Sequence, residues 1–243
     1  NMKPNVYLRL SIAAIILTAL HFFYALSFTS GEVFDLHKIL WTVFSNFLIV
    51  FILGMYVRRS TLAKFNLILS VFVVHYLIGH FNLSIEAYIF NVTDRSKTIE
   101  ELLQGLFVAL FFAPIFVYLL TNWDRSKIGY AFKPRPILGW VWRVIVGVFL
   151  YLIFYLAAGM ILQATYPELM DFYGDKLPPL DIMIITQFPR GLIFVSVAIL
   201  ILRTSASPWI KNAILIGSIF AILGAIAPLI PPSELMPVII RQV

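Results

Sequence analysis

The sequence predicts an all-α, polytopic membrane protein with seven transmembrane helices, arranged as a single domain over residues 1–243. Its composition supports this fold class, because 61% of the residues are hydrophobic and the mean hydropathy is +0.93. Charged residues make up only 12% of the chain, about half the share found in soluble domains. The chain also contains repeated apolar runs of about 20 residues, the length that crosses roughly 30 Å of hydrocarbon.

Seven such runs follow one another along the chain. The first comes after Lys3 and is interpreted as a retained helix, because its apolar core is too long for a cleaved signal peptide. The third run leaves two alternatives, one long helix through Glu86 or a break at "GHFNLS". The predicted spans cover residues 6–28, 39–57, 65–81, 102–120, 137–162, 182–202 and 210–230.

Basic residues predict the orientation of the spans. When the connecting segments are assigned alternately to two sides, one side receives most of the Lys and Arg residues and one acid, Asp124. The positive-inside rule then places the N-terminus in the cytoplasm and the C-terminus outside, in a bacterial inner membrane. The basic residues on the cytoplasmic side are Lys3, Arg9, Arg58, Arg59, Lys64, Arg125, Lys127, Lys133, Arg135, Arg143, Arg203 and Lys211.

The net charge of +6 is therefore mainly a topology signal, and we expect no nucleic-acid partner. We expect membrane lipids as partners, with anionic lipid at the cytoplasmic basic loops such as "WDRSKIGYAFKPRP". The absence of cysteine from the sequence excludes disulfides and thiol nucleophiles. We find no serine-nucleophile motif and no phosphate-binding loop, so the sequence names no catalytic residue and predicts no cofactor.

The polar residues of the predicted spans gather in the outer half of the membrane. Arg190 lies nine residues beyond Asp181, about 13 Å below the external surface. Pro189 removes a backbone donor beside it and is expected to kink or break the helix, while Gly191 permits close approach by another backbone. Polar groups are costly in hydrocarbon unless they face water or one another, which favours an outward-facing polar pocket. The candidate ligand-binding residues are Arg190, Gln187, Glu86, His80, His75, His21 and Asn46, with Gln104 and Gln163 at similar depth.

A metal site is not expected from this set. His75 and His80 are five residues apart, about 140° around an α-helix, so an α-helix would not place them on one face. A metal or haem site would have to be built across helices, for example from His21 and His80.

Three classes of function are consistent with these residues. The first is transport or binding of a small anionic or amphiphilic ligand from the outside, with Arg190 as the charge partner. The second is an integral-membrane enzyme acting on a lipid or isoprenoid, with His80 or His21 as acid/base and Arg190 holding a head group. The third is a structural or signalling membrane partner, in which Arg190 is a clamp to Glu86 between the third and sixth helices.

An internal duplication is a further possibility raised by the sequence. Arg9 opens the first span as Arg143 opens the fifth, and "RRSTLAKFN" after the second span resembles "RTSASPWIKN" after the sixth. The third span contains "ILSVF" where the seventh contains "LIGSIF", and Glu86 and Glu234 follow them. This pattern predicts a parallel repeat of three plus one plus three helices. The alternative is that basic residues mark cytoplasmic helix ends without duplication.

The stretches "YPELMDFYGDKLPP", "QFPRGLIF" and "IEAYIF" resemble segments of a group of uncharacterised bacterial polytopic membrane proteins. That group has no known activity, so the resemblance transfers no catalytic residue. It implies that Glu86, Gln187 and Arg190 form a shared polar set. It also implies a chain that continues beyond "PVIIRQV", with the last external segment leading to another helix.

Overall fold

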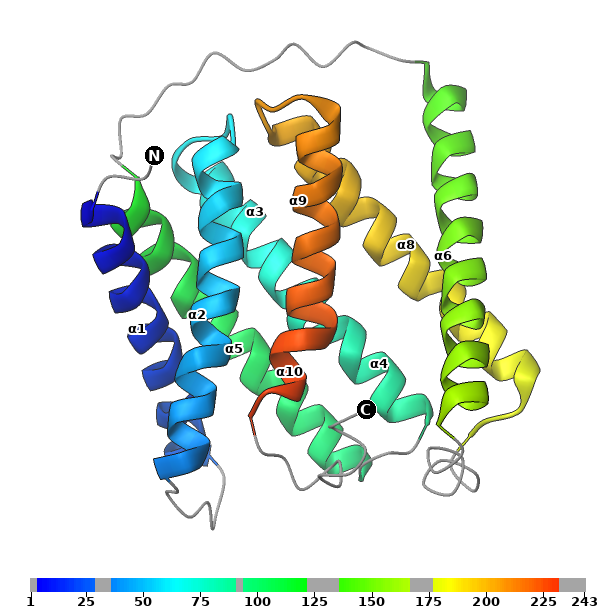
Figure 1. The fold of residues 1–243 in the computed structure, drawn as a ribbon, viewed down its shortest axis with the longest axis horizontal. Helices are drawn as coiled ribbons and strands as arrows, with labels where there is room; N and C mark the ends of the chain where they lie inside the picture. Colours follow the sequence, from blue (N-terminus) through cyan, green and yellow to red (C-terminus); the bar gives the residue numbers. More distant parts are fainter. Residues whose placement is uncertain (1–3, 29–35, 91–93, 122–135, 167–176, 232–243) are drawn as a thin grey trace.

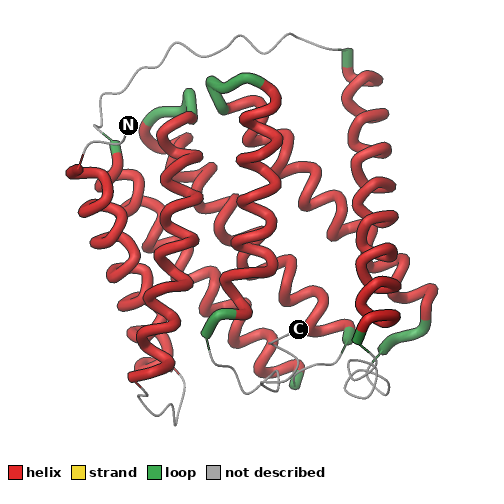
Figure 2. The backbone as a smooth tube through the Cα atoms, in the orientation of Figure 1, coloured by secondary structure: helices red, strands yellow, loops and turns green. Residues whose placement is uncertain are grey.

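The computed structural model describes residues 4–28, 36–90, 94–121, 136–166 and 177–231. Within these ranges the chain is helical apart from short connections (Figures 1 and 2). Seven helical segments are long and apolar enough to cross a membrane, which confirms the predicted multi-pass helical protein. The helices are α1 (Pro4–Phe28), α2 (Leu36–Arg59), α3 (Lys64–Tyr76), α4 (Asn82–Ile89), α5 (Arg95–Leu120), α6 (Ile137–Thr165), α8 (Leu180–Thr204), α9 (Trp209–Ala221) and α10 (Ala227–Leu229).

Two of the seven segments contain a short π-helix. The first π-helix, Leu77–Phe81, joins α3 to α4, so the third segment is one helix from Lys64 to Ile89. This resolves the alternatives left by the sequence in favour of a continuous helix through Glu86. The second π-helix, Ile222–Ile226, joins α9 to α10 in the same way. π-helices are rare and often lie at functional sites, so both positions are candidates for a functional site.

Pro189 does not break its helix, contrary to one of the two expectations. α8 continues without interruption from Leu180 to Thr204 with the proline inside it. Side chains of α6, rather than a backbone, lie closest to Gly191, because a Cβ there would lie 2.9 Å from Cδ1 of Tyr151. Gly147 of α6 meets Val195 of α8 at a similarly short distance, 2.8 Å from a Cβ position to Cγ2. Small residues therefore let α6 and α8 pack closely, as is usual in membranes.

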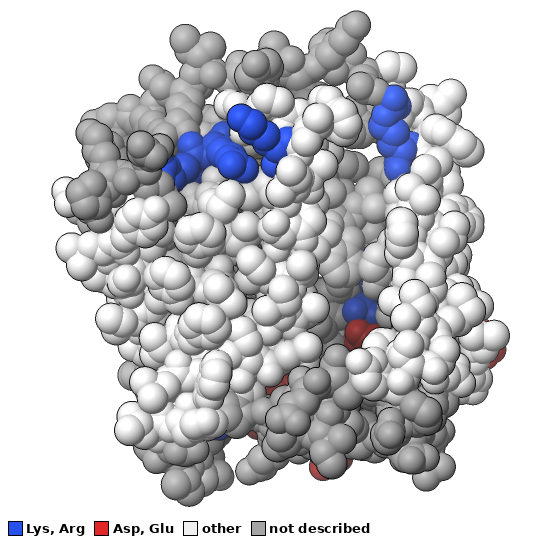
Figure 3. All heavy atoms as spheres, in the orientation of Figure 1, with Lys and Arg blue, Asp and Glu red and all other residues white. Residues whose placement is uncertain are grey.

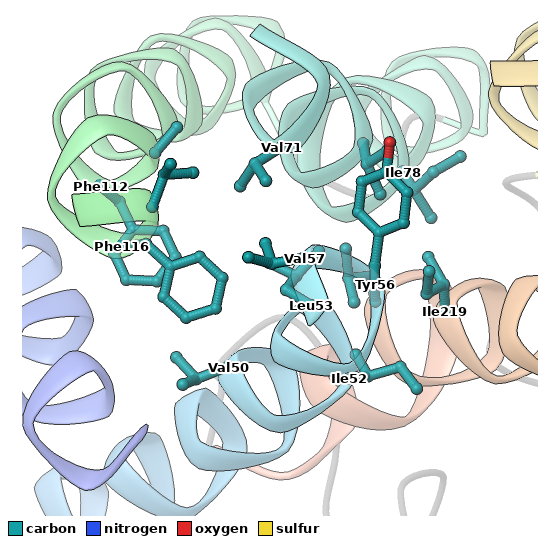
Figure 4. Packing of buried hydrophobic residues seen from close by; sticks show 14 of the residues in the cluster. Val50, Ile52, Leu53, Tyr56, Val57, Val71, Ile78, Phe112, Phe116 and Ile219 are labelled. Carbon is teal, nitrogen blue, oxygen red and sulfur yellow. The ribbon is translucent and has the colours of Figure 1, made fainter. Parts of the chain in front are cut away.

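The apolar core lies between α1, α2, α3, α5, α8 and α9. Tyr56, Phe112 and Phe116 are fully buried there and are among its largest side chains (Figure 4). α6 lies outside this core and packs mainly along α8, with most of its surface exposed (Figure 1). In a membrane protein such a surface is covered by lipid or by another helix.

The charged residues divide between the two ends of the helix bundle. Lys and Arg side chains gather at the end where α2 turns into α3 and α8 into α9, which we call the basic end (Figure 3). The described acids lie at or toward the opposite end, the acidic end, and they are Glu86, Asp94, Glu100, Glu101 and Asp181. Blue and red atoms adjoin at one further place, in a hollow on the side between α9 and α6 (Figure 3).

Candidate functional site

A pocket of about 390 Å³ lies in the half of the bundle toward the acidic end, and we call it the histidine pocket. Five segments converge on it: the last turns of α1, the first turns of α2, the first π-helix, the first turns of α5, and the second π-helix with α10. Its polar lining residues are His21, Lys38, Thr42, Ser45, Asn46, His75, His80, Glu101 and Gln104, and its apolar ones include Phe22, Ala25, Ile49, Leu223, Ala227 and Pro228.

The first π-helix brings His75 and His80 together. Their ring centroids are 5.3 Å apart, although the two residues were expected on different faces of an α-helix. His75 lies in the last turn of α3 and His80 in the π-helix, whose i to i+5 hydrogen bonds widen the turn between them, so the angle of an α-helix does not apply to this pair. His21 of α1 completes the group, with its ring centroid 6.1 Å from that of His80.

His75 has the most unusual environment of the three histidines. Its side chain is 1% exposed, and among the described residues neither ring nitrogen has a hydrogen-bond partner. A buried polar group without a partner is costly, so its retention points to a partner that binds there. His21, by contrast, has its Nδ1 2.9 Å from the carbonyl oxygen of Leu17. His21 therefore donates from Nδ1 to its own helix and presents Nε2 to its other surroundings.

The remaining polar groups of the pocket fix its wall. Asn46, a predicted site residue, donates from Nδ2 to Oγ1 of Thr18 at 3.0 Å and is 3% exposed. Ser45 donates to the carbonyl oxygen of Ala227 at 2.8 Å, which ties α2 to α10. Gln104 donates to the carbonyl oxygen of His21 at 3.4 Å. Each bond joins the wall to backbone or to a neighbouring helix, so the lining is held in place before any ligand arrives.

The sequence did not single out Ser45, Lys38 or Glu101 as lining residues. Lys38 and Glu101 stand near helix starts at the acidic end, where charges are ordinarily anchors, and Ser45 is a small hydroxyl inside an apolar span. One sequence signal was present, because Glu101 and Gln104 are three residues apart and so share a face of α5. The predicted Gln163 lies on the exposed end of α6 and lines no part of this pocket.

Arg190 belongs to a second cluster. Its Nη2 lies 2.7 Å from Oε2 of Glu86, which joins α8 to α4 by an ion pair. Nε donates to Oδ1 of Asn82 at 3.3 Å, and Nη1 donates to Oε1 of Gln187 at 3.1 Å. The guanidinium carbon also lies 5.6 Å from the ring centroid of Tyr155 on α6. Every nitrogen of the guanidinium therefore has an acceptor, which is how a charge is tolerated at this depth.

Two tyrosines of α6 close this Arg190 cluster from the side. Tyr155 donates to Oε1 of Glu86 at 3.0 Å, and Tyr151 donates to Oε1 of Gln187 at 3.1 Å. Arg190 is 5% exposed, whereas the side chain of Glu86 is 32% exposed. The arrangement matches the clamp between the third and sixth helices that the sequence allowed.

The predicted site residues thus form two groups. The histidine pocket gathers His21, His75, His80 and Asn46, and the Arg190 cluster gathers Arg190, Gln187 and Glu86. The transport and enzyme hypotheses both expect one pocket lined by Arg190 and a histidine. Arg190 does not line the histidine pocket, so this pocket does not meet that expectation.

Within the described ranges, no three His, Asp or Glu side chains lie close enough to hold one metal ion. Comparisons with models of known protein families, with curated protein sequences and with solved structures each found no match. The function is therefore argued from the geometry of the two groups.

Proposed function

We propose that the protein binds or transports a small amphiphilic ligand, which enters the histidine pocket from the external side of the membrane. The observation that supports this most strongly is His75, which lines the pocket and whose buried ring nitrogens have no hydrogen-bond partner in the described part of the chain. A ligand polar group at this place would satisfy the imidazole and remove the cost of its burial. The apolar wall formed by Phe22, Ile49 and Leu223 would hold the hydrocarbon part.

The lining favours a ligand with a neutral polar group over an anionic ligand. Arg190, the arginine expected to attract an anion, is paired with Glu86 in the other cluster. The remaining charged lining residues are Lys38 and Glu101, which have opposite signs and lie near helix starts. Among the described lining residues, an anion would meet no arginine and a single lysine, Lys38, together with the acid Glu101, so its loss of water would be poorly compensated. A hydroxyl or amide group both donates and accepts, as does a neutral imidazole.

The charge distribution supports an external opening in a bacterial inner membrane. Figure 3 shows Lys and Arg side chains gathered at the basic end. The described basic residues on the side predicted to be cytoplasmic are Arg9, Arg58, Arg59, Lys64, Arg143, Arg203 and Lys211. The first and seventh segments run in the same direction, from the basic end to the acidic end (Figure 1). The pocket then faces outward, and the basic end is where anionic lipid would bind.

A parallel internal repeat is the architecture we propose for this transport role. The connections after α2 and α8 pair with each other at an isolated bridge between Ser60 and Ser205, 145 positions apart. The backbone N–H of Thr61 donates to the carbonyl oxygen of Thr204, and that of Ala206 donates to the carbonyl oxygen of Arg59. Ala206 and Arg59 are the positions 145 residues from Thr61 and Thr204, so the second bond repeats the first with the two halves exchanged.

The two π-helices are related by the same spacing. They begin at Leu77 and Ile222, again 145 positions apart. A Cβ at Gly79 would contact Leu223, and a Cβ at Gly224 would contact Ile78, so this contact is also reciprocal. Such exchanged contacts are expected of two halves related by an approximate two-fold axis, and many transporters are built in that way. Glu234, which the sequence comparison paired with Glu86, lies outside the described residues.

Photolabelling tests the proposal. A fatty alcohol carrying a diazirine would be irradiated with the membrane-embedded protein, beside a matched diazirine fatty acid of the same chain length. We expect saturable labelling of peptides from α1, α2 and the second π-helix by the alcohol, and weaker labelling by the acid. His75→Phe keeps the volume and removes both nitrogens, so it should abolish the saturable part.

Two outcomes would contradict the proposal. Labelling confined to the outer faces of the helices would show that the pocket takes no amphiphile. Stronger saturable labelling by the acid would show that the ligand is anionic. His37→Phe is the matched control, because His37 is exposed at the start of α2 and does not line the pocket.

A further inference from the structure

We infer that the Arg190 cluster is a second copy of the histidine pocket, located at the equivalent place in the other half of the chain and closed by its own ion pair. The inference rests on the proposed repeat and extends the proposed function, because it assigns the protein two binding positions of which one is occupied by its own side chains.

The equivalence appears first in the contact between α2 and α10. Ser45 donates to the carbonyl oxygen of Ala227 in the wall of the histidine pocket. Adding 145 to Ser45 gives Arg190, and subtracting 145 from Ala227 gives Asn82. Arg190 donates to Asn82, so the same two positions are hydrogen-bonded in both halves.

Other lining positions of the pocket follow the same rule. Thr42 corresponds to Gln187, which accepts a hydrogen bond from Arg190. Pro231, at the edge of the pocket, corresponds to Glu86, the ion-pair partner of Arg190. The spacing was fixed by the bridge of the connections and by the π-helices, which lie outside these pairs. The finding that the same spacing relates a lining residue of the pocket to Glu86, the ion-pair partner of Arg190, is therefore an independent observation.

The flanking helices agree with this assignment. α1 packs along α2 in the first half, and α6 packs along α8 in the second half. At the 134-residue offset of Arg9 and Arg143, His21 corresponds to Tyr155, which faces the guanidinium and donates to Glu86. An imidazole ring of the pocket thus has a phenol ring as its counterpart.

Side-chain size explains why one copy is open and the other closed. In the histidine pocket the three positions are occupied by Ser45, Ala227 and Pro231, which are small and uncharged. In the Arg190 cluster a long guanidinium occupies the position equivalent to Ser45 and fills the space toward the acid Glu86. The Arg190 guanidinium takes the place that a ligand would take. Figure 3 shows a hollow between α9 and α6 in which basic and acidic side chains adjoin.

The ligand that fits the second copy, once it is vacated, is again a small amphiphile. Its lining would be Asn82, Gln187 and the tyrosine hydroxyls of α6, all of which are neutral. In the wild-type protein the ion pair closes the second of these two sites and leaves the histidine pocket open.

Single cysteines can test this because the sequence contains none. Ala227→Cys reports on the histidine pocket, and Asn82→Cys reports on the equivalent position; both residues are buried, at 2% and 1% exposure. The probe is the small neutral thiol reagent hydroxyethyl methanethiosulfonate. We expect Ala227→Cys to react quickly and Asn82→Cys slowly. Adding Arg190→Ser and Glu86→Ala to Asn82→Cys should raise its rate by at least an order of magnitude.

The converse exchange is the second measurement. Ser45→Arg with Pro231→Glu, added to Ala227→Cys, should close the histidine pocket and slow that cysteine's reaction by a similar factor. Size-exclusion chromatography identifies the variants that fold. If one pair of substitutions prevents folding, the reaction rate of the other pair tests the equivalence of the two sites.

The outcomes separate the two proposals. If Ala227→Cys reacts quickly but neither exchange changes a rate in a folded protein, the equivalence of the two sites is wrong and the histidine pocket stands. If Ala227→Cys reacts as slowly as Asn82→Cys in the wild-type background, the histidine pocket itself is closed and the proposed function fails.

Discussion

The ring centroids of His75 and His80 lie 5.3 Å apart on one face of the third transmembrane segment, although five residues separate them in the sequence. His75 lies in the last turn of α3 and His80 in the first π-helix, so the wide turn of the π-helix lies between the two rings. His80 also packs against Gly105 of α5, where a Cβ would overlap its ring. The position of His80 is therefore set by two helices at once.

We predict that Gly105→Ala displaces His80 and narrows the histidine pocket. A methyl group at this position is overpacking, which costs about 1–3 kcal/mol, more than the roughly 1 kcal/mol that alanine gains over glycine in a helix. The melting temperature should fall, and the nitrogen chemical shifts of His80 should change. Gly217→Ala is the control, because nothing lies within 4 Å of its Cβ position. Equal melting temperatures for both variants would refute this packing.

A double-mutant cycle tests the clamp between Arg190 and Glu86. Arg190→Ala leaves the Glu86 carboxylate and the amide oxygens without their donor, so we expect a loss of about 3 kcal/mol in unfolding free energy. Glu86→Ala added to Arg190→Ala should restore part of this, because no unpaired charge then remains. Additive losses measured by thermal or denaturant unfolding in detergent would show that the two residues do not act as a pair.

The orientation is testable with an impermeant thiol reagent on intact cells. We predict that Pro179→Cys, at the start of α8, reacts from the outside. Leu62→Cys, in the connection between α2 and α3, should react only after the cells are permeabilised. The reverse pattern would invert the topology and place the histidine pocket on the cytoplasmic side.

Helix content and the number of apolar segments could be predicted from the sequence, because hydropathy alone requires seven spanning lengths. The gathering of polar residues was also predictable for His21, His80 and Asn46, since depth follows from position along a span. The partition into two groups was not. It depends on which side of each helix faces a neighbour, and the π-helices change that facing without a clear signal in "LIGHF" or "ILGAI".

Arg190 illustrates the same limit. Its depth and its partner Glu86 follow from the sequence as alternatives, yet only the packing of α8 against α4 and α6 decides between a pocket floor and a clamp. The continuation of α8 through Pro189 likewise depends on neighbouring helices, which can support a proline inside a membrane helix.

The central claim is that His75 binds the polar group of a neutral amphiphile, and mass spectrometry of copurifying molecules tests it most directly. Wild-type protein, His75→Phe and the exposed control His37→Phe would be purified identically from the same membranes. We predict that a hydroxyl- or amide-bearing amphiphile is enriched with the wild type and with His37→Phe, and falls about tenfold with His75→Phe, the loss expected for one hydrogen bond. The same molecules in the same amounts with all three proteins would contradict the claim.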